Sequence, residues 1–411
     1  MPLTIRITVL GCESALSLPH QPAVLTDGNS AAALPLSQRK LPALDGVRGL
    51  AVLAVMFTHT EARRFPHLLR DAFGYGWIGV DLFFVLSGFL ITGILVDTRE
   101  CANYFRSFYA RRFLRIFPLY YGFLVIAMLA FPYVVAPGYM PVRAERWLYF
   151  AYLMNWTALA PWHHHILKHF WSLGIEEQFY LVWPLVVLLV NRRRLLPLVL
   201  ALEAVVLTGR SWWVYHHGPG VAVQFATITR MDGLLLGAAC ALIVRWFQIP
   251  RRLAVALFWC SILLVSGYMV GFRLSGAYRQ VFKQSTGYAI LAIGFAALVL
   301  YAVLTDGERT WQQHSLCSRP LVLLGKYSYG IYVLHVPIFY FLNRLARHLP
   351  QAMHESLWFD CVLVAVKFAL AFGAASLSYN LYEKRFLALK DRFAPIYREA
   401  PVATASAAAL A

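Results

Sequence analysis

Long runs of apolar residues, separated by short polar and basic segments, dominate the chain from residue 44 onward. Each run is about 20 residues long, the length at which a helix crosses the roughly 30 Å hydrocarbon core of a membrane. A weaker stretch, 146–157, is too short to cross, and its Trp and Tyr residues favour an interfacial or re-entrant helix. The pattern predicts an all-α membrane bundle of about ten spans, at residues 44–61, 75–96, 114–135, 171–190, 195–214, 222–246, 252–271, 285–304, 321–343 and 359–382.

The segments on either side of these spans are predicted to be tails. Residues 1–40 are of mixed polarity and contain no apolar core behind a basic start, which argues against a signal peptide. We expect them to form a mobile cytoplasmic tail or to precede the true start of translation. Residues 41–390 are expected to form one membrane domain, and residues 391–411 a cytoplasmic C-terminal tail.

Composition agrees with this architecture. Of 411 residues, 60% are hydrophobic and only 14% are charged, whereas soluble domains are typically about 25% charged. These values exclude an ordinary soluble enzyme, a disordered chain and a fibrous repeat. The six cysteines show no CxxC spacing, so we interpret them as packing residues and not as disulfides or zinc ligands.

The net charge of +17 comes mainly from arginine clusters between the apolar runs. With the N-terminus in the cytoplasm and ten crossings, the basic clusters at 99–112, 192–194, 245–252 and 384–392 all fall on the cytoplasmic side. This is the positive-inside bias, and it predicts a multi-pass protein with both termini in the cytoplasm. No nucleic-acid-binding motif accompanies the charge, so we expect no nucleic-acid partner.

The first predicted span carries Arg48 and His59, eleven positions apart. At about 100° and 1.5 Å per residue, the two side chains share one helix face and lie about 16 Å apart along the axis. Arg48 is then near the cytoplasmic rim and His59 is deep in the membrane. An imidazole there is a natural general base for a hydroxyl, although a lone histidine more often makes a helix–helix hydrogen bond.

Arg112 and Arg115 lie three positions apart at the inner end of the third span, hence on one helix face. Two guanidinium groups in this arrangement form a clamp for phosphate groups. A plain positive-inside signal explains them equally well without a ligand.

Carboxylates also lie inside apolar runs, where an ionisable group is costly unless it is paired or functional. Glu176 and Glu177 begin the fourth span and favour a functional role, such as orienting an imidazole or binding an acceptor hydroxyl. Asp81 lies near the outer end of the second span and is able to pair with a cation or an imidazole. Ser87 precedes Gly88, which favours close helix packing, since the flanking residues do not form a nucleophile elbow.

Further polar residues occur late in the chain. Arg230 and Asp232 lie in the sixth span and are expected to join a buried charge network. Tyr329, Tyr332 and His335 follow helical spacing along one side of the ninth span.

A histidine run at 163–165, with His169, lies in a predicted external loop that contains Pro and Trp. The run has no carboxylate or cysteine partner nearby in the sequence. We therefore expect these histidines to be solvated and to hold no metal.

Six segments together resemble acyltransferase family 3, the multispan membrane acyltransferases that modify sugars and lipids at bacterial surfaces. They are Arg48-x10-His59, residues 79–89, Arg112-x2-Arg115, residues 171–180, Arg230-x-Asp232-Gly233 and residues 328–335. The resemblance covers about residues 41–390. The family's usual ending is similar to Glu-Arg-Pro-Phe, and this chain has Glu383-Lys384-Arg385-Phe386, without the proline. No segment long enough for a fused esterase-like domain follows, so the resemblance is to the stand-alone form.

The resemblance implies transfer of an acyl group, commonly acetyl, from cytoplasmic acyl-CoA to a hydroxyl of a carbohydrate or glycolipid, such as a surface polysaccharide, in a bacterial inner membrane. Arg48, Arg112 and Arg115 are expected to hold the CoA phosphates. His59 is expected to take the hydroxyl proton, with Glu176 or Asp81 orienting it. The expected substrate or oxyanion contacts are Ser87, Trp171, Arg230, Asp232, Tyr329 and His335.

Two other functions use the same residues differently. A transporter or flippase for an anionic solute or glycolipid uses the intramembrane charges as a pathway, but leaves the spacing of Arg48 and His59 unexplained. An accessory subunit uses them only to hold helices together. The sequence contains no pattern from which we predict the acceptor or the oligomeric state.

Overall fold

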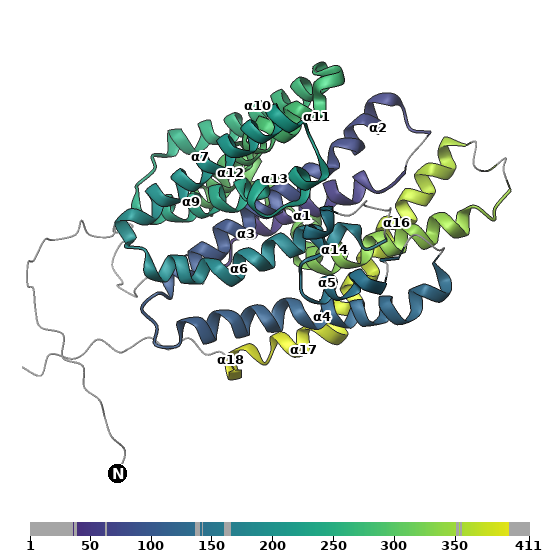
Figure 1. Cartoon of the computed structure of the whole chain (residues 1–411), viewed down its shortest axis with the longest axis horizontal. Helices are drawn as coiled ribbons and strands as arrows, with labels where there is room; N and C mark the ends of the chain where they lie inside the picture. The colour runs from purple at the N-terminus through teal and green to yellow at the C-terminus, as the bar shows by residue number, and fades with distance from the viewer. Residues whose placement is uncertain are drawn as a thin grey trace, which may run out of the picture. The chain divides into compact units, whose positions relative to one another are not determined.

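The computed structural model describes residues 36, 39–61, 64–135, 140–141, 143–159, 166–350, 353 and 356–393. Within these residues all regular secondary structure is helical, which confirms the predicted all-α class (Figure 1). The histidine run at 163–165 lies outside the described residues, as do most of the two predicted tails.

Ten longer helices carry the bundle, and short helices and turns join them. The longer ones are α1 (Pro42–Thr58), α3 (Ile78–Asp97), α4 (Tyr104–Val134), α6 (Trp171–Leu189), α7 (Arg192–His217), α9 (Asp232–Trp246), α10 (Arg251–Leu274), α12 (Tyr288–Leu304), α14 (Arg319–Ala346) and α16 (Leu357–Ser378). The short ones are α2 (His67–Gly74), α5 (Arg146–Phe150), α8 (Val221–Phe225), α11 (Arg279–Phe282), α13 (Trp311–Leu316), α17 (Lys384–Leu387) and α18 (Lys390–Phe393).

Eight helical segments in the described part of the chain are long and apolar enough to cross a membrane, judged by length and composition. They are His67–Asp97, Tyr104–Val134, Lys168–Leu189, Arg192–His217, Arg251–Leu274, Gly276–Leu304, Arg319–Ala346 and Leu357–Leu387. Each matches one predicted span, so eight of the ten predicted spans are confirmed and the protein is a multi-pass membrane protein.

The other two predicted spans contain shorter helices. In 44–61, α1 has 17 residues and ends at Thr58. In 222–246, the chain turns at η6 (Ile228–Arg230), and α9 has only 15 residues. The hydrophobic pattern of the sequence did not predict this turn, because the residues around the polar Arg230 and Asp232 are themselves apolar. The stretch 146–157 is confirmed as too short to span, since α5 has five residues.

Burial separates inner helices from outer ones. The apolar windows of the segments that contain α3 and α12 are each 78% buried, whereas those of α7 and α10 are 17% and 22% buried. Helices α7, α9, α10 and α12 pack together, and α4 packs against α17 (Figure 1). The outer helices expose large apolar side chains such as Val205 and Leu263, as a lipid-facing surface requires.

Two helix pairs at the centre approach closely because glycine stands at their contact. A Cβ atom on Gly325 of α14 would lie 1.8 Å from the carbonyl oxygen of Asp45 in α1. A Cβ on Gly88 of α3 would lie 2.0 Å from the carbonyl oxygen of Leu234 in α9. The expectation that Ser87-Gly88 permits close packing is therefore confirmed, and both contacts hold the helices that carry the candidate site residues.

Gly88→Ala is expected to destabilise the protein by about 1–3 kcal/mol, because the added methyl group forces α3 and α9 apart. Thermal unfolding in detergent measures this as a lower midpoint. Gly209→Ala in α7 is the control, since nothing lies within 4 Å of its added Cβ atom and alanine favours a helix interior by about 0.5–1 kcal/mol. Equal midpoints for the two variants would contradict the close-contact explanation.

Candidate functional site

A cavity that we call the arginine cavity lies between α1, α3, α4, α6 and α14 and contains about 890 Å³ of space, part of it open to solvent. Its lining includes Arg48, Ser87, Arg112, Arg115, Glu176 and Tyr329. These six residues were all singled out from the sequence, and the fold brings them together.

A second cavity, the histidine cavity, contains about 1050 Å³ of partly open space. Its lining includes His59, Lys168, His169, Trp171, Arg230 and Lys283. Val80 and Tyr332 line both cavities, so the two spaces meet at these side chains. A molecule that lies in the arginine cavity is therefore next to the imidazoles across one shared wall.

The three predicted clamp residues present their charges to the arginine cavity. Arg48 donates to a carboxylate oxygen of Asp45, one turn earlier in α1, at 2.6 Å. Arg112 lies 5.4 Å from the ring centroid of Tyr180. Within the described residues neither Arg112 nor Arg115 forms a salt bridge or a side-chain hydrogen bond, so their guanidinium donors are available to a ligand.

Glu176 is held by two hydroxyl groups. Ser87 donates to Oε1 at 3.1 Å and Tyr180 donates to Oε2 at 3.2 Å. All three side chains line the arginine cavity. Glu176, one of the two carboxylates that were expected to orient His59, is therefore bound to Ser87 and Tyr180 on the other side of the shared wall.

Three imidazoles lie together, and two of them, His59 and His169, line the histidine cavity. The ring centroids of His59 and His335 are 5.0 Å apart, and those of His169 and His335 are 5.2 Å apart. His169 and His335 are buried. The expectation that His169 is solvated is wrong, because η5 (Lys168–Phe170) turns it into the bundle against α14.

Backbone carbonyls fix the tautomers of these rings. Nδ1 of His59 lies 2.8 Å from the carbonyl oxygen of Val55, and Nδ1 of His335 lies 2.8 Å from that of Tyr332. A carbonyl only accepts, so each Nδ1 carries the proton and each neutral ring keeps a lone pair on Nε2. The partner that orients His59 is thus a carbonyl of its own helix, not the predicted carboxylate of Glu176 or Asp81.

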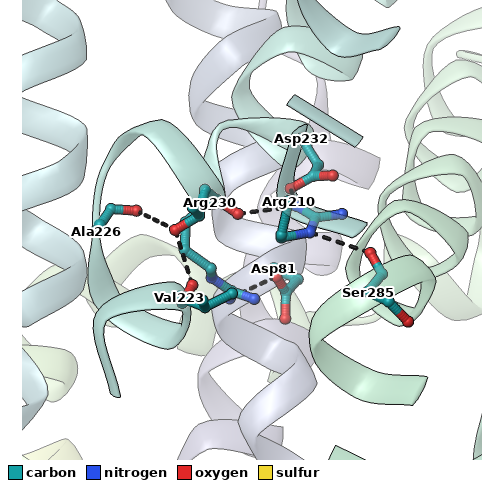
Figure 2. A network of polar contacts seen from close by, with 8 residues as sticks. Asp81, Arg210, Val223, Ala226, Arg230, Asp232 and Ser285 are labelled. Atoms are coloured by element: carbon teal, nitrogen blue, oxygen red, sulfur yellow. Dashed lines mark hydrogen bonds and ion pairs between the residues drawn. The ribbon is translucent and has the colours of Figure 1, made fainter. Parts of the chain in front are cut away.

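Two buried ion pairs lie near each other (Figure 2), and Arg230 of one pair lines the histidine cavity. Arg230 donates to Asp81 at 2.7 Å, which joins η6 to α3. Arg210 of α7 pairs with Asp232 and also donates to the carbonyl of Ser285 at 3.1 Å. The predicted buried charge network is present. Arg210 was not predicted to belong to it, because the other charged residue of its span, Glu203, gave no indication of an ion pair.

Hydroxyl groups mark the wall between the cavities. Tyr332 donates to the carbonyl oxygen of His169 at 2.8 Å, and its oxygen lies 2.5 Å from Oγ of Ser172. Tyr329, predicted as a substrate or oxyanion contact, lies in the arginine cavity and donates to the carbonyl of Ile116 at 2.7 Å. Trp171, in contrast, faces the histidine cavity beside Arg230.

The five cysteines in the described part of the chain are free: Cys101 and Cys240 are buried, Cys317 and Cys361 are half-buried, and Cys260 is exposed. Within the same residues, no group of three or more His, Cys, Asp or Glu side chains is placed to hold a metal ion.

Comparison with known proteins assigns the chain to a family. A family model described as an acyltransferase domain matches residues 41–377. The chain belongs to acyltransferase family 3. This confirms the resemblance that the sequence motifs suggested, and with it the class of enzyme. No solved structure matches the chain.

Bacterial members of acyltransferase family 3 are similar over most of the chain. O-acetyltransferase OatA of Staphylococcus aureus is 31% identical over 75% of this chain and 52% of its own length. Peptidoglycan O-acetyltransferase OatA of Listeria monocytogenes is 28% identical over 89% and 60%. Putative peptidoglycan O-acetyltransferase YrhL of Bacillus subtilis is 29% identical over 84% and 55%. The chain thus spans little more than half the length of these relatives.

Proposed function

We propose that this protein transfers an acetyl group from acyl-CoA to a hydroxyl of a surface carbohydrate. One observation carries the proposal: a cavity lined by three arginines meets a cavity lined by two imidazoles, His59 and His169, at the shared wall of Val80 and Tyr332. Arg48 and His59 belong to the same helical segment and line one cavity each. The family membership supports the reaction class.

The arginine cavity is the donor site in this proposal. Arg48, Arg112 and Arg115 bind the phosphates of CoA through charge-assisted hydrogen bonds. The pantetheine arm extends past Ser87 and Glu176 toward the shared wall, which brings the thioester to the histidine cavity. In the predicted orientation the arginine cavity is on the cytoplasmic side, where acyl-CoA is found, and both termini are cytoplasmic.

His59 is the general base of the proposed reaction. Nε2 of His59 takes the proton of the acceptor hydroxyl, whose oxygen attacks the carbonyl carbon of the thioester. The C–S bond then breaks, and the imidazolium returns its proton to the departing thiolate of CoA. Arg230, whose Nε and Nη1 have no hydrogen-bond partner among the described residues, stabilises the oxyanion from the wall of the histidine cavity.

The histidine cavity is the acceptor site in this proposal. Trp171, Phe225 and Tyr288 line it with aromatic surface, which suits a sugar ring. The Listeria relative is named as acting on peptidoglycan. We propose a peptidoglycan-like carbohydrate as the acceptor and a bacterial inner membrane as the location.

The direct test uses purified protein in vesicles with radiolabelled acetyl-CoA and peptidoglycan fragments. Label recovered on the glycan as an alkali-labile ester is the expected result. If solute or glycolipid moves across the vesicle membrane without acyl-CoA, while no ester forms, the protein is a transporter and the proposal is overturned.

Arg112→Ala combined with Arg115→Ala is expected to raise the KM for acetyl-CoA at least tenfold, because two phosphate contacts are lost. The acceptor KM should change little. Arg106→Ala is the control, since Arg106 is an exposed arginine of the same helix that does not line the cavity. An unchanged KM for acetyl-CoA in the double variant would mean that these arginines only mark the cytoplasmic side of the membrane and do not bind the donor.

A further inference from the structure

Lys283 is a buried cation that the proposed reaction does not use. Its side chain lines the histidine cavity, and the residue is only 8% exposed. Nζ lies 3.9 Å from the ring centroid of Trp77 and 5.9 Å from that of Tyr288. Among the described residues, no carboxylate lies within salt-bridge distance of Nζ, and no side-chain hydrogen bond of Lys283 is present.

The charges around the cavity do not balance. No Asp or Glu is among the residues that line it, although Lys168, Arg230 and Lys283 are. Asp81, behind the wall, pairs with Arg230 through Oδ1. Its Oδ2 atom is buried without a hydrogen-bond partner among the described residues, so Lys283 does not hydrogen-bond to this carboxylate. The ammonium group of Lys283 is thus largely buried without a hydrogen-bonded counter-ion among the described residues, which is costly unless an anion arrives.

The position of Lys283 is built into the fold. The residue begins the π-helical segment η8 (Lys283–Gly287), and such segments occur frequently at functional sites. The next residue, Gln284, accepts from the backbone N–H of Gly220 at 2.8 Å. The carbonyl of Ser285 accepts from Arg210 at 3.1 Å. These two contacts tie the segment to α7 and to the start of α8, so the lysine is held at the cavity.

We infer that the acceptor carries a carboxylate or phosphate near the hydroxyl that is acylated, and that Lys283 binds this anionic group in the histidine cavity. The inference rests on the proposed function and narrows its acceptor to an anionic carbohydrate. The aromatic face of Trp77 keeps the ammonium group desolvated and directed, which strengthens its attraction to an anion. Lys283 is a specificity residue here, and the proton transfer stays with His59.

The test compares matched acceptors with and without an anionic group. The carboxylate pair is the N-acetylglucosaminyl-N-acetylmuramic acid disaccharide and its neutral N-methylamide. The phosphate pair is N-acetylglucosamine 1-phosphate and the neutral methyl glycoside. The wild-type protein should favour one anionic member at least tenfold in kcat/KM, and the pair that shows the preference identifies the anionic group.

Lys283→Met should raise the KM for the favoured anionic acceptor at least tenfold, with kcat changed less than twofold and the neutral acceptor unaffected. Lys283→Arg should restore most of the loss, which a packing role of the lysine stem would not predict. An equal KM for charged and neutral acceptors in the wild type, with no effect of Lys283→Met, overturns the inference but leaves the acyltransferase proposal standing. Loss of all transfer in the wild type would instead reject the proposed function.

Discussion

Replacing His59 by alanine is expected to lower kcat for acetyl transfer by about 100- to 10,000-fold, the usual contribution of a general base. Nε2 of His59 is the lone-pair nitrogen at the cavity, because Nδ1 is held by the carbonyl of Val55 at 2.8 Å. The neighbouring imidazoles of His169 and His335 are buried, and each gives its own N–H to a backbone carbonyl. Neither is positioned to substitute for the side chain at the end of α1.

A second variant separates catalysis from folding. Asparagine cannot act as a base, but in His59→Asn the amide nitrogen takes the place of Nδ1 and can still donate to Val55. This variant should keep the wild-type unfolding midpoint and lose activity as His59→Ala does. His348→Ala, at an exposed histidine, is the control and should remain fully active. Substantial activity in a folded His59→Asn protein would remove His59 from the chemistry and make it a structural residue.

The arginines of the donor cavity could be identified from the sequence because local spacing determines their place. Arg112 and Arg115 are three residues apart, so a helix presents both on one face whatever surrounds it. Arg48 and His59 were related by the same arithmetic along one helical segment. The structure brings Arg48 to the same cavity as Arg112 and Arg115.

Contacts between distant segments could not be obtained in this way. Asp81 and Arg230 are 149 positions apart, and only the packing of α3 against α9 brings them together. His169 lies beyond an irregular loop with no periodicity, so nothing in its surroundings indicated that it turns inward. Lys283 lies between two predicted spans, 252–271 and 285–304, and nothing in the sequence around it indicated burial. Its burial depends on a π-helical turn that has no sequence signature.

The roles of the carboxylates were the hardest to predict from the sequence. Asp81 and Glu176 both looked like partners for an imidazole, since each lies in an apolar run at a suitable depth. In the structure Asp81 faces Arg230, and Glu176 is bound by Ser87 and Tyr180. Which cation or hydroxyl a buried carboxylate meets is decided by neighbouring helices, and a single sequence does not record that choice.

Asp81→Ala is therefore expected to act first on stability, by about 3–5 kcal/mol, because it leaves the charge of Arg230 buried without its partner. The Arg230–Asp81 bridge is 2.7 Å long, and its side chains are 2% and 6% exposed. The double variant Asp81→Ala with Arg230→Met removes both charges and should recover much of the lost stability, since methionine keeps an apolar side chain against Tyr288. Thermal unfolding of the wild type, Asp81→Ala, Arg230→Met and the double variant in detergent measures the coupling.

The bundle contains a matched control for this experiment. Arg273 and Asp71 form a bridge of the same length, 2.7 Å, but their side chains are 60% and 42% exposed. Asp71→Ala should cost about 1 kcal/mol or less, because water or lipid headgroups solvate the remaining arginine. If Asp81→Ala is as mild as Asp71→Ala, Arg230 does not depend on Asp81 for its charge balance. Asp81 would then no longer count as the counter-ion of Arg230. The inference that Lys283 carries the unbalanced positive charge of the histidine cavity would be weakened.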